Sequence, residues 1–183
     1  MSERLQPAYL KREERTHLLS LLEQSRNDLL LKLKGADDRL WNARRRQDQW
    51  CLAEIAEHLL LSERSFRAAV ETALSGDPSP DWRQRTQGKD VRVEVTLLTL
   101  QTKAHASPHL RPQGLLLREE VVSGFEEERA KTMALAATVT LPLKAYLERH
   151  HSPFFDWLNA YQWLLYAGFH SVRHLHQVVE VSQ

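Results

Sequence analysis

Two histidines near the C-terminus have the spacing of metal ligands. His170 and His174 lie four residues apart in a stretch rich in aliphatic and aromatic residues. In a helix this spacing places both imidazoles on one face, about one turn apart, where they could hold the same ion. Burying two unpaired polar rings in an apolar stripe is costly. A shared divalent metal ion would remove this cost; a pair of core histidines bonded to carbonyls or water is the alternative. The other members of the stripe are Trp163, Ala167, Val178 and Val181.

A third ligand has to come from another helix, and His58 meets this requirement. It aligns with small or apolar positions that are expected to face inward: Cys51, Ile55, Ser62 and Ala69. Three neutral imidazoles leave coordination positions open for water or substrate, as in catalytic zinc sites. The sequence therefore predicts a metal site made of His58, His170 and His174.

The other histidines lack such surroundings. His105 and His109 share the spacing of four, but Pro108 lies between them and disfavours a regular helix. We therefore do not expect this pair to bind a metal ion. The four histidines that remain are expected at the surface: His17, His150, His151 and His176.

Four predicted helices would position the three ligands. Apolar residues at spacings of three and four predict helices over residues 13–34, 52–74 and 118–137, and a last helix from 152 to about 181. For the last helix we expect Ser152 as its cap, Pro153 and Asp156 in its first turn, and a polar face. That face would hold Asn159, Gln162, Arg173, His176 and Glu180.

The remaining segments read as connections. Residues 36–49 are polar, and residues 75–81 (SGDPSPD) form a linker. Residues 91–95 alternate like a strand, but a lone strand has no partner, so residues 88–104 are interpreted as an extended segment or a short helix. The simplest architecture is one all-α domain over residues 1–183, folded as a four-helix bundle.

Composition excludes several classes of protein. The net charge of +1 gives no electrostatic field strong enough to hold nucleic acid, and Arg44–Arg46 is a short basic run followed at once by Gln47 and Asp48. Cys51 is the only cysteine, which excludes an intrachain disulfide and a multi-cysteine zinc site. The N-terminus resembles no secretion signal, and no apolar run approaches the roughly 20 residues that cross a bilayer. We expect a cytoplasmic protein that binds neither nucleic acid nor membrane.

Two segments resemble motifs of the DinB superfamily. Residues 50–59, WCLAEIAEHL, resemble the signature around the first metal histidine of that family, and residues 169–177, FHSVRHLHQ, resemble its closing pair of histidines. The resemblance spans nearly the whole chain. It implies a DinB-like four-helix bundle, often a homodimer, in which His58, His170 and His174 hold zinc, nickel or a similar ion. One departure is Cys51, at a position where small residues such as serine are common.

The resemblance implies a metal-dependent enzyme acting on a small molecule. Relatives include thiol-dependent S-transferases and isomerases, and others are labelled metal-dependent hydrolases, so a metal-activated water or thiolate and a low-molecular-weight thiol cofactor are expected. The alternative is a non-catalytic, metal-stabilised dimeric bundle. A general base cannot be assigned: Glu54, Glu57 and Glu63 lie near His58 in sequence, but Glu54 and Glu57 fall on the face predicted to be wet.

Overall fold

The computed structural model describes residues 8–99, 106–152 and 154–182 and is mostly helical. Four long helices dominate it: α2 (Arg12–Gly35), α4 (Leu52–Ser75), α7 (Arg118–Thr138) and α8 (Ala160–Val181). The bounds of the first three agree with the predicted helices to within one residue. Helix prediction succeeded here because each helix repeats apolar residues on one face, such as Leu18, Leu22, Leu29 and Leu33 of α2, all of which are buried.

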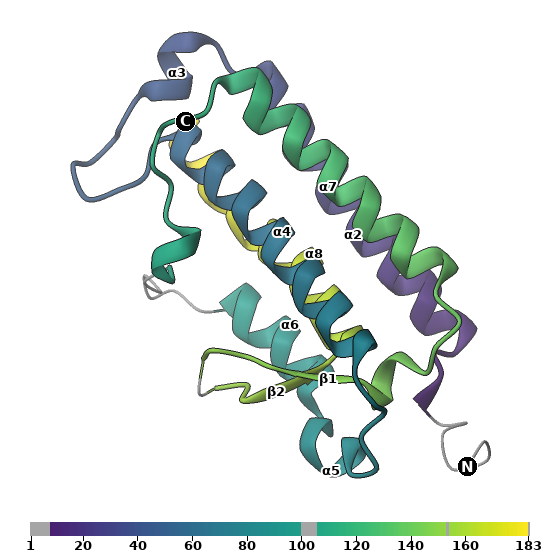
Figure 1. The fold of residues 1–183 in the computed structure, drawn as a ribbon. Coiled ribbons are helices and arrows are strands. Elements are labelled where there is room, and N and C mark those ends of the chain that lie inside the picture. Colours follow the sequence, from purple (N-terminus) through teal and green to yellow (C-terminus); the bar gives the residue numbers. More distant parts are fainter. Residues whose placement is uncertain (1–7, 100–105, 153, 183) are drawn as a thin grey trace.

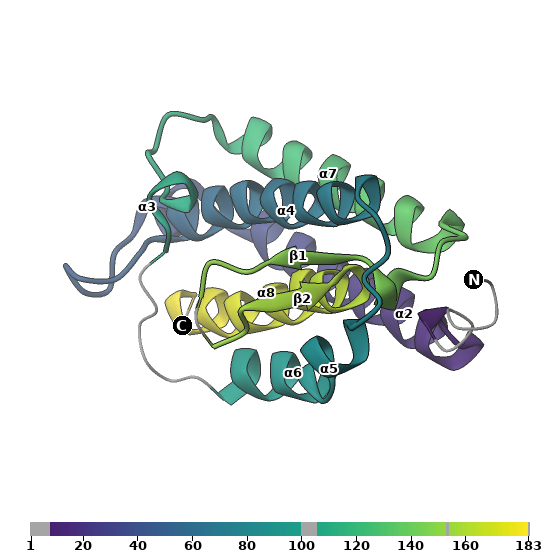
Figure 2. The same ribbon diagram turned by 60° about the horizontal axis from the view of Figure 1, so that its bottom comes forward.

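The long helices pack lengthwise against one another. Helix α8 contacts α2 and α4, and α7 contacts the same two helices from the other side, so that each long helix touches two of the others. A further helix, α6 (Lys89–Thr99), packs on the outer side of α8 (Figures 1 and 2). Helix α6 realises one of the two alternatives for residues 88–104, while residues 100–105, including His105, lie outside the described part of the chain.

Several short elements occupy the connections. Helix α3 (Asp38–Asn42) lies within the polar segment after α2, where Trp41 is buried, and α5 (Trp82–Thr86) follows the linker. The 3-10 turns η2 (Pro108–Leu110) and η3 (Leu143–Ala145) also lie in connections. No helix among the described residues is both long and apolar enough to cross a membrane.

The prediction for the start of the last helix was wrong. Strands β1 (Leu147–Arg149) and β2 (Trp157–Asn159) pair antiparallel before α8, with Glu148 opposite Leu158. The hairpin is drawn in front of α8 in Figure 2, and β2 contacts this helix. Asp156 has a positive φ of 55°, which a helix does not allow. Ser152 therefore does not cap the helix, and Pro153 lies outside the described residues.

Asn159 and Gln162 form the actual cap of α8. The Asn159 side chain accepts a hydrogen bond from the Gln162 N–H (2.8 Å), and the Gln162 side chain accepts one from the Asn159 N–H (3.1 Å). Both residues are buried, against the prediction that they belong to the polar face. Their amide groups also donate hydrogen bonds to Thr86 of α5, so the cap joins α8 to the short helices.

The interior is divided by a polar layer. One apolar cluster includes Leu22, Phe66, Ala136 and Phe169, and a second includes Leu29, Leu60, Phe125 and Val178. On each long helix, buried polar residues fall between the members of the two clusters along the sequence. They include Ser25, Glu63, Arg129 and Ser171. The candidate site lies beside this layer, on α4 and α8.

Candidate metal centre

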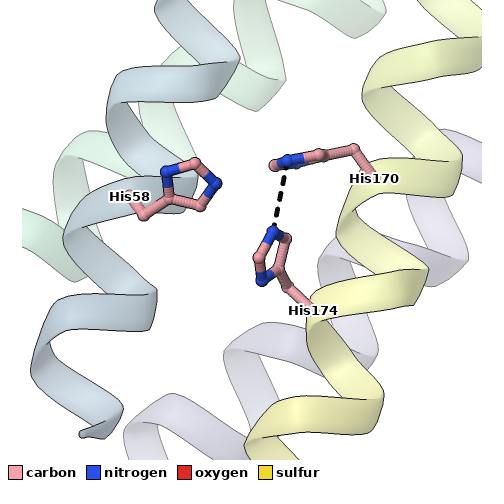
Figure 3. Close-up of side chains that lie close together, drawn as sticks. All are labelled: His58, His170 and His174. Atoms are coloured by element: carbon pink, nitrogen blue, oxygen red, sulfur yellow. Dashed lines mark hydrogen bonds between the residues drawn. The ribbon is translucent and has the colours of Figure 1, made fainter. Parts of the chain in front are cut away.

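The structure brings His58, His170 and His174 together. His58 lies on α4, and His170 and His174 lie one turn apart on α8, with their rings turned toward one another (Figure 3). Each ring offers one nitrogen as a ligand, and these three nitrogen atoms lie within 4.8 Å of one another. The side chains are buried, with 4%, 8% and 6% of their residue surface exposed. In the described part of the chain, no other group of three histidine, cysteine or carboxylate side chains has such an arrangement.

A backbone carbonyl fixes the tautomer of His58. The Nδ1 atom of His58 lies 2.7 Å from the carbonyl oxygen of Leu110 in η2. Since a carbonyl can only accept, Nδ1 carries the hydrogen and donates it. In the neutral ring, Nε2 then holds a lone pair, which accepts a long hydrogen bond from Ser62 Oγ at 3.4 Å. The bond from Nδ1–H to the Leu110 carbonyl, on the nitrogen that would not ligate, is the kind that orients metal-ligating histidines in proteins.

His174 is oriented in a similar way. Its Nδ1 donates to Gln177 Oε1 at 2.7 Å, which leaves a lone pair on Nε2. This Nε2 lies 3.2 Å from Nε2 of His170. Two lone pairs cannot face each other at this distance without a positive charge between them. The pair therefore needs either a hydrogen on Nε2 of His170 or a cation bound to both nitrogens.

Burial keeps the three rings neutral. It lowers the pKa of His58, brings the pKa of His174 to about 3, and brings that of His170 well below its usual value. For His170 and His174, the neighbouring histidines lower the pKa further because each disfavours a second positive charge. Neutral imidazole is the form that binds a metal ion, so all three are ready to ligate at neutral pH.

The distances also suit a small divalent cation. Zinc–nitrogen bonds of about 2.0–2.1 Å in tetrahedral geometry place two ligand nitrogens about 3.3 Å apart. The 3.2 Å between the Nε2 atoms of His170 and His174 is close to this value. Since the three ligand nitrogens lie within 4.8 Å of one another, the longest of their distances would have to shorten by about 1.5 Å at most to close on one ion. The residues present therefore fit a three-histidine site.

Aromatic rings surround the cluster. Trp50 lies beside His58 with ring centroids 4.9 Å apart, and Phe66 meets His170 edge-on at 5.1 Å. Tyr166 stacks on His170 at 6.1 Å, and burial raises the pKa of its hydroxyl to about 12. These rings exclude water from the three imidazoles and strengthen electrostatic interactions there.

Glu57, next to His58, anchors the chain segment that contacts His58. Its two carboxylate oxygens accept hydrogen bonds from the backbone N–H groups of Gln113 (3.1 Å) and Gly114 (2.7 Å). Glu57 is only 6% exposed, so the prediction that it lies on a wet face was wrong. The periodicity of α4 could not reveal this, because the segment that covers Glu57 is distant in the sequence.

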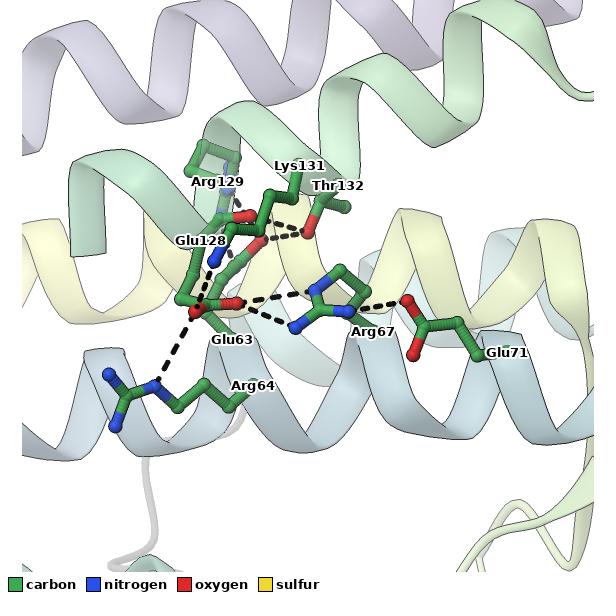
Figure 4. Close-up of polar contacts among 8 residues, drawn as sticks. All are labelled: Glu63, Arg64, Arg67, Glu71, Glu128, Arg129, Lys131 and Thr132. Carbon is green, nitrogen blue, oxygen red and sulfur yellow. Dashed lines mark hydrogen bonds and ion pairs between the residues drawn. The ribbon is translucent and has the colours of Figure 1, made fainter. Parts of the chain in front are cut away.

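Glu63 is engaged in the polar layer rather than available as a base. Its carboxylate accepts hydrogen bonds from Arg129 Nε (2.9 Å) and a terminal nitrogen of Arg129 (2.8 Å), and from the Thr132 hydroxyl (2.7 Å). Figure 4 shows this group behind the outer network of Glu128 with Arg64, Arg67 and Lys131. Arg129 also donates to the carbonyl of Ala167 and to Ser171 Oγ, in the turn of α8 that carries His170.

Glu54 and Cys51 have structural contacts at the start of α4. The Glu54 carboxylate accepts a hydrogen bond from the Cys51 N–H (2.9 Å) and pairs with Arg44 (2.6 Å). Burial raises the pKa of the Cys51 thiol, which keeps it protonated. Cys51 is not part of the three-histidine group.

The remaining histidines divide into exposed and buried ones. His17, His109, His151 and His176 are exposed, and the surface position expected for His17, His151 and His176 is confirmed. The prediction was wrong for His150, which is only 3% exposed because it packs on Trp163 and Tyr166 of α8. Those contacts depend on the hairpin, which the sequence did not reveal.

Comparisons with known proteins identify the family of this chain. Protein YuaE of Bacillus subtilis (strain 168), described as uncharacterised, is 22% identical over 169 residues, which cover 90% of this chain and 97% of YuaE. No solved structure shows a significant match. The family model of the DinB superfamily matches residues 21–178, a span that includes all three histidines. The chain therefore belongs to the DinB superfamily.

Proposed function

We propose that the protein binds one divalent metal ion, zinc or nickel, through His58, His170 and His174. The observation that carries this proposal is the convergence of three buried, neutral rings whose ligating nitrogens lie within 4.8 Å of one another. Two of the rings have their Nδ1 hydrogens engaged, by Leu110 and Gln177, and so present Nε2 lone pairs. Membership of the DinB superfamily supports the same ligand set.

We propose further that the site is catalytic and acts on a small molecule. A divalent ion with three histidine ligands keeps a coordination position open and would lower the pKa of a water or of a low-molecular-weight thiol. The chain's own residues would hold the rings neutral and, through Trp50, Phe66 and Tyr166, keep bulk water away. The reaction class is S-transfer from a thiol, or hydrolysis.

The architecture supports treating residues 1–183 as a single domain. The ligands come from α4 and α8, which lie far apart in the sequence and pack side by side. We propose that the four long helices are the DinB-like four-helix bundle, and that two copies form a homodimer as the family resemblance implies.

A non-catalytic, metal-stabilised dimeric bundle is the second candidate. The observation that favours it is the engagement of all the nearby glutamates: Glu54, Glu57 and Glu63 each hold a backbone group or an arginine. No carboxylate of these three is free to act as a general base.

Metal analysis tests the binding site. The purified protein, dialysed against zinc or nickel and analysed by mass spectrometry, is expected to hold about one ion per chain. His58→Ala and His174→Ala should each lose most of it. His176→Ala is the matched control, since His176 lies on the same helix but is exposed. Full metal content in either of the first two variants would disprove the ligand assignment.

A spectroscopic titration separates the two candidate functions. The cobalt-loaded protein is titrated with β-mercaptoethanol while the near-ultraviolet absorption is recorded. A catalytic site with an open position should develop a thiolate-to-cobalt charge-transfer band. An unchanged spectrum in a protein that holds one cobalt ion would favour the metal-stabilised bundle.

A further inference from the structure

A cavity lies beside the hairpin, outside the three-histidine cluster. It has a volume of about 620 Å³ and is lined by Arg149, His150, His151 and Asp156. Arg149 ends β1, and the other three residues belong to the turn that leads into β2. None of these residues has a role in the proposed metal site.

His150 is held rigidly at this cavity. Its ring stacks on Trp163 at a centroid distance of 4.9 Å and on His151 at 4.4 Å. Phe155 meets the ring edge-on at 5.0 Å, and Tyr166 lies at the same distance. A ring packed on so many sides has one orientation, so its two nitrogens have fixed positions.

One ring nitrogen of His150 is used and the other is not. The backbone N–H of Ser152 donates to Nδ1 at 3.0 Å, so Nδ1 is an acceptor and the neutral ring carries its hydrogen on Nε2. The Nε2 atom is buried and has no hydrogen-bond partner in the structure. Burial lowers the pKa of His150 to about 4, so the ring stays neutral at pH 7. A buried donor without an acceptor costs about 1–3 kcal/mol, which a bound acceptor would recover.

We propose that this cavity binds a small carboxylate, one oxygen of which accepts a hydrogen bond from His150 Nε2 while the other faces the Arg149 guanidinium. The guanidinium is available because its pair with Asp156 is long, at 3.6 Å, and both side chains are largely exposed, at 73% and 58%. Burial and the charge of His109 lower the pKa of His151, so it adds no fixed charge. The negative charge of Asp156 at the same cavity disfavours a doubly charged phosphate, so a singly charged anion fits best. His151 is exposed and can rotate to admit the ligand.

The carboxylate site does not depend on a metal ion. Tyr166 separates the two sites, with its ring 5.0 Å from that of His150 and 6.1 Å from that of His170. The carboxylate should therefore bind equally to metal-free and metal-loaded protein, and failure of either proposal leaves the other standing.

Nitrogen-15 NMR of the histidine side chains tests the proposal directly. Metal-free protein labelled on histidine is titrated with sodium acetate at constant ionic strength. The Nε2 resonance of His150 should shift with a saturable dependence on acetate, and inorganic phosphate should bind more weakly. His150→Phe keeps the aromatic packing but removes the donor, and acetate affinity, followed in this variant on the resonances of His151, should be about tenfold or more lower. Arg149→Gln should lower it by a smaller factor.

A second cavity provides the matched control. It has a volume of about 640 Å³ and is lined by Arg12, Glu13, Thr16, His17 and Ser20, but its histidine is exposed. Acetate should leave the resonances of His17 unshifted, and His17→Phe should bind acetate like the unmodified protein. A linear, non-saturating shift of His150, equal shifts at His17 and His150, or unchanged affinity in a folded His150→Phe variant would overturn the proposal.

Discussion

Arg129 and Glu63 form a completely buried ion pair between α7 and α4. Two nitrogens of the guanidinium donate to the two carboxylate oxygens at 2.9 and 2.8 Å, and the side chains are 0% and 2% exposed. Arg129 also donates to Leu22 and Ser25 of α2 and to Ser171 of α8. This one side chain therefore joins all four long helices beside the candidate metal site.

Removing one partner of this pair should be strongly destabilising. Arg129→Met or Glu63→Gln is expected to lower the free energy of unfolding by about 3–5 kcal/mol, because the other group is left buried without its partner. The double variant Arg129→Met/Glu63→Met should lose less than the sum of the single changes. Urea denaturation followed by circular dichroism measures the three values.

The pair of Arg67 with Glu71 is the control for this experiment. The two residues lie on α4 four positions apart, and the Glu71 side chain is 50% exposed (Figure 4). Glu71→Ala should change stability by about 0.5 kcal/mol or less. Equal losses for Glu71→Ala and Glu63→Gln would contradict the structural role assigned to the buried pair.

Glu57 should affect metal binding without touching the ion. Glu57→Ala frees the backbone at Gln113 and Gly114, which loosens the segment whose Leu110 carbonyl orients His58. We expect zinc affinity to fall about tenfold or more, as for other residues that hold a metal ligand in place. Competition with a chelating dye gives the affinity. Glu54→Ala, on the same helix, should leave it nearly unchanged, and equal effects in the two variants would argue against this role.

Gly168 allows α8 to approach α2 closely. A Cβ atom at this position would lie 2.6 Å from Cγ and 2.7 Å from Cδ2 of Leu21. Gly168→Ala should therefore destabilise the protein by about 1–3 kcal/mol despite the better helix propensity of alanine. The double variant Gly168→Ala/Leu21→Ala should relieve the clash, so the loss caused by Gly168→Ala should be smaller in that background. Thermal unfolding checks both expectations.

His150 should make stability depend on pH. Its pKa is about 4 in the folded protein and about 6.5 when unfolded, so between these values the unfolded chain binds the proton more tightly. Stability is unaffected by this group above pH 6.5 and falls as pH drops toward 4, by at most about 3 kcal/mol in all. His150→Phe removes this dependence. When the pH is lowered from about 7 to about 4.5, the free energy of unfolding should therefore fall less in the variant than in the unmodified protein. A constant difference would show that the ring is not held neutral.

The sequence predicted the helices well because their signals are local. Apolar spacing located α2, α4 and α7, and the stripe through His170 and His174 is buried as expected. The hairpin before α8 was missed because each strand has only three residues, too few for a strand pattern, and its partner lies across a turn. As a result, His150, Asn159 and Gln162 were predicted at the surface, although they are buried in the structure.

The contacts around the three histidines could not be predicted in the same way. The proximity of His58 to His170 and His174 was inferred from inward-facing positions and from a family motif. Its hydrogen bond to Leu110 joins residues 52 positions apart through a segment without periodicity. The partners of Glu57 and Glu63 are likewise set by tertiary packing, which in the case of Glu57 overrides the predicted exposed face.

The hydrogen bond from His58 to Leu110 has a consequence for how the chain would respond to metal supply. A complete site requires α4, the η2 segment and α8 at once, so no fragment containing only one of them can reproduce it. Ion binding would therefore stabilise only the fully assembled chain, by an amount that grows with the free ion concentration. Chains synthesised when the ion is scarce would unfold more often and be degraded sooner by proteases. The lifetime of the protein would then depend on metal availability.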